Sequence, residues 1–87
     1  LIIEALSDGG LSGGLPKILS EELVMEMIQG TTSFIKEKKL TTSELKNLVT
    51  SPGGTTISAL RVLEKKSIRS ALIESIVAAS NRSKEFG

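Results

Sequence analysis

The sequence contains no cysteine and no histidine. Without cysteine there is no disulfide framework and no thiolate metal site, and without histidine there is no imidazole base and no ligand for most zinc or iron sites. The ten acidic residues are scattered, which leaves little for a calcium or magnesium cage. We therefore predict no metal site, and we expect any chemistry to use hydroxyls, backbone amides or a cofactor.

Aromatic residues and net charge are also scarce. Two phenylalanines are the whole aromatic content, and the formal net charge is +1. Base-stacking platforms and a strong basic field are therefore missing, which argues against a nucleic-acid partner. No uncharged apolar run approaches the roughly 20 residues of a membrane span, and no basic segment opens the chain. These absences predict a cytoplasmic protein with no membrane partner.

The chain is short, and its first residues are already periodic. Eighty-seven residues correspond to one small domain, with marginal stability unless a partner contributes. The sequence starts at Leu1, without an initiator methionine and within an apolar helical pattern. We therefore expect a fragment of a longer protein.

Apolar residues recur at helical spacing almost throughout, which predicts an all-α fold with about five helices. We expect helices over residues 1–7, 16–39 and 42–49, a fourth from Thr55 or Thr56 past Leu63, and a fifth over 67–84. The first should stop at Asp8-Gly9-Gly10, where a left-handed glycine can end it. Pro16 should lie in the first turn of the second helix, and Ser67 should cap the last.

The second expected helix is apolar over too much of its circumference for one partner. Its stripe runs through Leu19, Leu23, Met27 and Phe34, and other apolar residues widen it. Gly30 lies inside the helix, where close approach of another backbone can compensate for its cost. These features predict an obligate dimer.

Two loop segments have residue patterns that predict a local structure or a binding site. Thr41 and Glu44 have the spacing of a capping box. The segment from Ser51 to Ile57 combines a proline, two glycines and three hydroxyls before a helix start, so its backbone amides could hold a carboxylate or phosphate. The alternative is an ordinary turn followed by a threonine cap. The spacing of a nucleotide-binding P-loop is absent.

Several motifs, in this order, resemble the C-terminal domain of pyrroline-5-carboxylate reductase. They are Glu4-Ala5-Leu6-Ser7-Asp8-Gly9-Gly10, Gly14-Leu15-Pro16, Glu44-Leu45-Lys46, Val49-Thr50-Ser51-Pro52-Gly53-Gly54-Thr55-Thr56-Ile57, Leu63-Glu64 and Arg82-Ser83-Lys84-Glu85. The resemblance covers essentially all 87 residues. Thr41-Thr42 and Asn47 depart from it, since His-Pro and Asp are frequent there.

The resemblance implies a helical bundle interlocked with that of a second subunit, as a homodimer or a higher oligomer. It also implies an N-terminal Rossmann domain, absent from this chain, that binds NADPH or NADH. Residues 1–87 would then be the dimerisation and substrate-binding domain of an enzyme that reduces 1-pyrroline-5-carboxylate to L-proline. The fragment alone should be inactive.

The same resemblance assigns the substrate loop. Ser51, Gly53, Gly54, Thr55 and Thr56 would bind the substrate carboxylate, and the Thr56 hydroxyl would contact the imine nitrogen as the catalytic residue. The alternative hypothesis is a helical oligomerisation module without a catalytic role.

Overall fold

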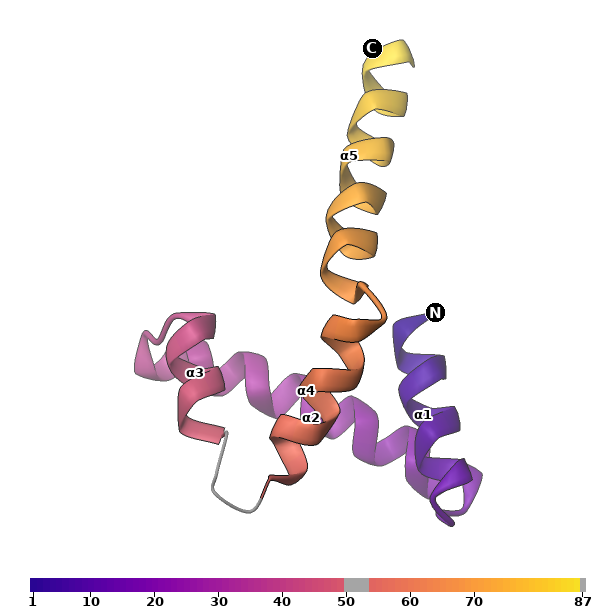
Figure 1. Ribbon diagram of the computed structural model, residues 1–87, viewed down its shortest axis with the longest axis vertical. Coiled ribbons are helices and arrows are strands. Elements are labelled where there is room, and N and C mark those ends of the chain that lie inside the picture. Colours follow the sequence, from indigo (N-terminus) through magenta and orange to yellow (C-terminus); the bar gives the residue numbers. More distant parts are fainter. Residues whose placement is uncertain (50–53, 87) are drawn as a thin grey trace. The chain divides into compact units, whose positions relative to one another are not determined.

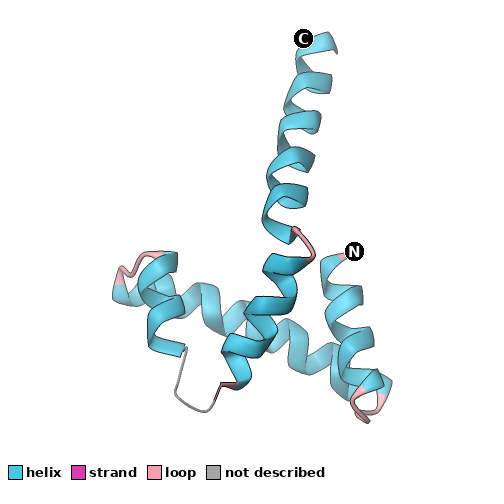
Figure 2. Cartoon of the chain, viewed as in Figure 1, coloured by secondary structure: helices cyan, strands magenta, loops and turns pink. Residues whose placement is uncertain are grey.

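The structure is a computed structural model that describes residues 1–49 and 54–86, and every regular element in those ranges is an α-helix (Figures 1 and 2). The prediction of an all-α fold is confirmed. The helices are α1 (Ile2–Ser12), α2 (Lys17–Lys38), α3 (Thr42–Val49), α4 (Thr55–Lys65) and α5 (Ile68–Phe86). The chain divides into two compact units, Leu1–Leu45 and Lys46–Gly87, which are described separately below.

The end of α1 differs from the prediction. The helix continues through Asp8, Gly9 and Gly10 to Ser12, so the expected stop at these residues is wrong. The left-handed glycine that follows the helix is Gly14, with a φ of 106°. The amide of Leu15 donates to the carbonyl of Gly10 over 3.0 Å, which is the long backbone bond typical of a helix end closed by a left-handed residue.

Close packing against α2 explains why glycine occurs inside α1. α1 packs across the first part of α2 (Figure 1). The buried hydroxyl of Ser20 on α2 donates to the carbonyl of Ser7 over 2.7 Å. A Cβ atom on Gly10 would overlap the Ser20 hydroxyl and would lie 3.3 Å from Ser20 Cβ. Gly10 is therefore required by the contact between the helices, and the contact keeps this glycine helical.

α2 is a continuous helix of 22 residues. Pro16 directly precedes it with a φ of −61° and a ψ of 147°, so the proline lies one position before the predicted first turn. At the other end Lys39 is left-handed, with a φ of 54°, and the amide of Leu40 donates to the carbonyl of Ile35 over 3.1 Å. Lys36 and Lys38 lie in the last turn, where positive charge favours the helix dipole.

The capping box before α3 is confirmed. The amide of Thr41 donates to the Glu44 carboxylate over 2.9 Å, and the amide of Glu44 donates to the Thr41 hydroxyl over 3.1 Å. The pKa of the Glu44 carboxyl is lowered, first by the bond from the Thr41 amide and then by the Thr41 side chain. The start of α3 is therefore fixed by its own sequence.

In the second unit, α4 and α5 are separated by the two residues Lys66 and Ser67. Ser67 has a φ of 62°, and its carbonyl accepts the first helical bond, from the amide of Ala71 over 3.1 Å. Arg69 pairs with Glu64 across this turn, with 3.4 Å between nitrogen and oxygen. α5 begins where predicted and extends to Phe86, two residues beyond the predicted end.

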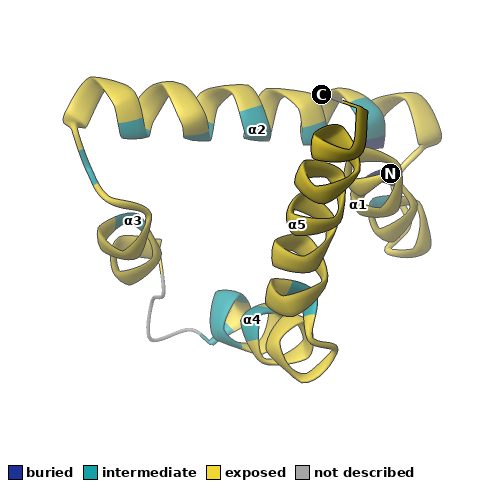
Figure 3. Cartoon of the chain, turned by 90° about the horizontal axis from the view of Figure 1, so that it is seen from above, coloured by how far each residue is buried: buried dark blue, intermediate teal, exposed yellow. Residues whose placement is uncertain are grey.

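Apolar side chains are largely uncovered. Within residues 1–49 and 54–86 only Ser7 and Ser20 are buried, and no apolar side chain is (Figure 3). Half-buried residues recur along one side of α2, among them Val24, Ile28 and Ile35. Apart from its chain neighbours and the backbone of its own helix, no atom of the described residues lies within 4 Å of a Cβ built on Gly30, so those residues do not make the close approach expected there. None of the helices in the described parts combines the length and apolar character that a bilayer span requires.

Candidate functional site

The N-terminus of α4 is the part of the predicted substrate loop that the structure describes. Gly54 directly precedes the helix with a φ of 79° and a ψ of −5°, a left-handed conformation that favours glycine. Its carbonyl accepts the first helical bond, from the amide of Ser58 over 2.9 Å. Among the described residues no side chain caps this end, and the first amides of a helix have no partner within the helix itself.

Two threonines begin this helix with different exposure. Thr55 is exposed, and Thr56 is half-buried together with Ile57. Neither threonine is the cap expected from an ordinary turn, because the N-cap position belongs to Gly54. The start of α4 thus carries the positive end of the helix dipole and first-turn backbone amides, and Thr56 lies in that first turn. Such an end can hold a carboxylate without a basic side chain.

The structure describes three of the five predicted substrate-binding residues. Gly54, Thr55 and Thr56 lie together at the start of α4. Ser51 and Gly53 lie outside the described residues. No cluster of three or more acidic side chains in the described ranges could hold a metal ion.

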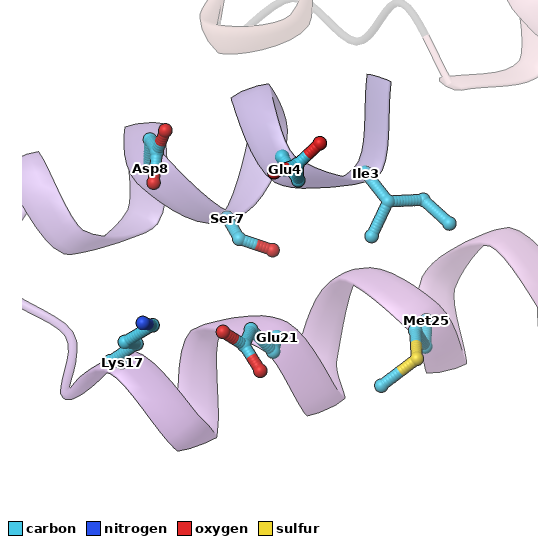
Figure 4. Close-up of a pocket in the computed structure, with 7 residues that line it drawn as sticks. All are labelled: Ile3, Glu4, Ser7, Asp8, Lys17, Glu21 and Met25. Atoms are coloured by element: carbon cyan, nitrogen blue, oxygen red, sulfur yellow. The ribbon is translucent and has the colours of Figure 1, made fainter. Parts of the chain in front are cut away.

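A second polar feature of the first unit was not predicted. A pocket of about 360 Å³ lies between α1 and α2 (Figure 4). Its lining consists of Ile3, Glu4, Ser7, Asp8, Lys17, Glu21 and Met25. The sequence signal was the pair Glu4 and Asp8, which are four residues apart and share a helix face. Glu21 joins them only through the packing of α2 on α1, which the sequence pattern did not indicate.

Taken together, these features define an all-helical domain with apolar faces open to a partner and an anion-competent helix start. A family model described as pyrroline-5-carboxylate reductase dimerisation matches residues 1–86. The chain therefore belongs to the pyrroline-5-carboxylate reductase dimerisation family, and the resemblance seen in the sequence is confirmed.

Individual relatives agree with this assignment. The chain is 48% identical over 87 residues to a pyrroline-5-carboxylate reductase from Synechocystis, covering 100% of this chain and 33% of that protein. It is 44% identical over 86 residues to the Arabidopsis thaliana reductase, covering 99% and 31% respectively. The chain thus spans about a third of the length of these relatives.

A solved structure has the same fold. The crystal structure of Plasmodium falciparum pyrroline carboxylate reductase with NADP bound superimposes with a TM-score of 0.93 at 36% identity. The match covers 99% of this chain and 33% of that one. A helical domain of this architecture therefore occurs within a larger NADP-binding protein.

Proposed function

We propose that this chain is the dimerisation and substrate-carboxylate-binding domain of an enzyme that reduces 1-pyrroline-5-carboxylate to L-proline with NADPH or NADH. The family match over residues 1–86 carries the proposal. The relatives bear the name of this reductase, and the chain corresponds to about a third of each. The domain would be joined to a separate nucleotide-binding domain in the complete enzyme.

The proposed dimer is supported by the exposed apolar side chains. Ile76 on α5 is 71% exposed and Ile18 on α2 is 72% exposed. Burying a side chain of this size contributes about 1.5–3 kcal/mol. Several such side chains on each subunit supply enough free energy for stable association, in the homodimer or in a higher oligomer built from it.

The substrate carboxylate would bind at the start of α4. The free amides of Thr55 and Thr56 suit a carboxylate, and the left-handed Gly54 sets the direction from which the chain enters the helix. Ser51 and Gly53 join this loop in the proposal through the family resemblance. The Thr56 hydroxyl would hydrogen-bond the imine nitrogen, orienting the ring without removing a proton.

The cofactor belongs to another part of the enzyme. Throughout the described ranges the secondary structure is helical, so the strand and glycine-rich turn of a dinucleotide-binding fold have no counterpart there. The residues that the structure describes therefore do not fit a nicotinamide dinucleotide site of their own. Hydride comes from the reduced nicotinamide, and this domain contributes substrate position and subunit contact.

The test is substitution of Thr56 in the complete reductase. Thr56→Val keeps the size of the side chain and removes the hydroxyl, so kcat/KM should fall about 10- to 100-fold with the dimer mass unchanged. Thr56→Ser keeps the hydroxyl and should retain most activity. Equal kinetics for Thr56→Val and the unmodified enzyme would remove this hydroxyl from the mechanism.

A helical oligomerisation module is the second candidate function, because uncovered apolar faces favour association whether or not a substrate binds. It predicts dimerisation without chemical-shift changes at Gly54, Thr55 and Thr56 when proline is added. Residue-specific shifts that saturate with proline would contradict it. The cytoplasmic location stays a prediction, which cell fractionation tests.

A further inference from the structure

The pocket between α1 and α2 is lined by more acidic than basic side chains. Three carboxylates and one lysine ammonium line it, which gives the lining a net charge of −2. In the described part of the chain, no ion pair joins Asp8 or Glu21 to a cation. Asp8 on α1 and Glu21 on α2 are therefore available to a ligand.

The Ser7 hydroxyl is a second, independent indication of a ligand. Ser7 is only 7% exposed, and its Oγ has no hydrogen-bond partner among the described residues. The carbonyl of the same residue is occupied by the Ser20 hydroxyl. Figure 4 shows the Ser7 side chain directed into the pocket, toward Glu21 on the facing helix. A buried hydroxyl without a partner is destabilising, so a group that hydrogen-bonds to it binds more favourably.

The rest of the lining limits the chemistry of the ligand. No group of three or more His, Cys, Asp or Glu side chains in the described ranges is placed to hold a metal ion, so we consider an organic cation. Ile3 and Met25 give one end of the pocket an apolar wall beside the polar groups (Figure 4). An ammonium group has three donors, and the pocket lining offers it acceptors of the right kind in the Asp8 carboxylate, the Glu21 carboxylate and the Ser7 oxygen. A short alkyl chain on that ammonium would lie along Ile3 and Met25.

We propose that this pocket binds the ammonium group of a primary aliphatic amine, with Asp8, Glu21 and Ser7 as its three acceptors. Lys17 lines the same pocket and opposes the binding of a second cation by like-charge repulsion. The amine comes either from a free small molecule or from a lysine of another copy of the chain. Both sources present the same group to the same acceptors.

The binding test uses n-butylammonium as the probe on the full chain in the oligomer that it forms, at constant ionic strength. Methyl resonances of Met25 and Ile3 should shift and saturate. Two matched probes serve as controls: n-butanol has the alkyl chain without the charge, and tetramethylammonium has the charge without N–H donors. Saturable shifts with butylammonium alone support the proposal. No saturation, or equal shifts with tetramethylammonium, would overturn it.

Variants then assign the acceptors. Ser7→Ala suits a helix and removes only the unpartnered hydroxyl, so the fold should be retained and Kd should rise about 10-fold. Glu21→Gln should raise Kd by at least as much. Glu26→Gln, on the same helix and outside the pocket lining, should leave Kd unchanged, and Lys17→Gln should lower it. Unchanged binding in both Ser7→Ala and Glu21→Gln would refute the assignment. If Ser7→Ala does not fold, the comparison of Kd for Glu21→Gln and Glu26→Gln tests the assignment: a Kd raised only by Glu21→Gln supports it, and equal Kd values refute it.

Light scattering during the same titration distinguishes the two sources. An oligomer mass that stays constant while the shifts saturate identifies a free amine as the ligand. A mass that falls as butylammonium saturates identifies a lysine of another copy, displaced by the probe.

Discussion

Replacing Gly10 with alanine is the sharpest test of the α1–α2 contact. The new methyl group would overlap the Ser20 hydroxyl and would lie 3.3 Å from Ser20 Cβ and 3.4 Å from Leu15 Cδ1. Ser20 cannot rotate away without giving up its 2.7 Å hydrogen bond to the Ser7 carbonyl. The substitution therefore breaks a buried hydrogen bond and, because Ser20 Cβ and Leu15 Cδ1 stay close to the new methyl group, also crowds the contact between the helices.

The net effect follows from three contributions. Alanine in place of a helical glycine stabilises by about 0.5–1 kcal/mol. Loss of the Ser20 hydrogen bond costs about 1 kcal/mol, and overpacking of a close contact costs about 1–3 kcal/mol. We therefore expect Gly10→Ala to lower the free energy of unfolding by about 1–3 kcal/mol.

Gly9 provides the matched control. It is the preceding residue of the same helix, and a Cβ built on it meets no atom within 4 Å. Gly9→Ala should raise the free energy of unfolding by about 0.5–1 kcal/mol, because only the helix propensity changes. Urea unfolding followed by circular dichroism measures both variants, at one protein concentration because association contributes to stability.

The double variant Gly10→Ala with Ser20→Ala separates the clash from the hydrogen bond. Removal of the Ser20 hydroxyl gives the new methyl group room, so the second substitution should cost less in the Gly10→Ala background than in the unmodified chain. A Gly10→Ala variant as stable as Gly9→Ala would refute the reasoning. The α1–α2 contact would then be looser than described.

Two further predictions concern helix capping and association. The lowered pKa of Glu44 stabilises the fold at pH values above the ordinary carboxyl pKa of 4.5. In urea unfolding across the acidic range, the stability advantage over Glu44→Gln should vanish as the pH falls through the lowered pKa. A stability advantage that does not depend on pH would contradict this prediction. Ile76→Glu, on the exposed face of α5, should shift the mass measured by light scattering toward that of the monomer, because a charge replaces an apolar side chain. The control Glu74→Gln, on the same helix, should leave the mass unchanged. A dimer mass that Ile76→Glu does not change would place α5 outside the interface.

Local chemistry was predicted well from the sequence. The capping box of Thr41 and Glu44 needs only residues three apart, and both of its hydrogen bonds are present. The helical periodicity likewise located all five helices. The start of α4 was predicted to within one residue, although the cap is Gly54 and not a threonine.

Tertiary contacts explain what was missed. Gly9 and Gly10 have the composition of a helix end, yet the contact with Ser20 keeps them within α1. The left-handed residue that closes the helix is Gly14, which lies between the first two helices expected from the sequence. The pocket around Ser7 was also missed because it depends on a tertiary contact: Glu21 lines it from a different helix. Of the substrate loop, Gly54, Thr55 and Thr56 were located correctly at a helix start, and their role in binding stays a prediction.

The exposed apolar faces also have a consequence for biosynthesis of the protein. In the proposed dimer, each newly made copy carries those faces in water until it meets another, and that encounter is second order in concentration. Aggregation and capture by chaperones compete during the same interval. At low expression the slow encounter limits the yield of assembled protein, and a mixed pair can shelter an unstable variant beside a stable subunit.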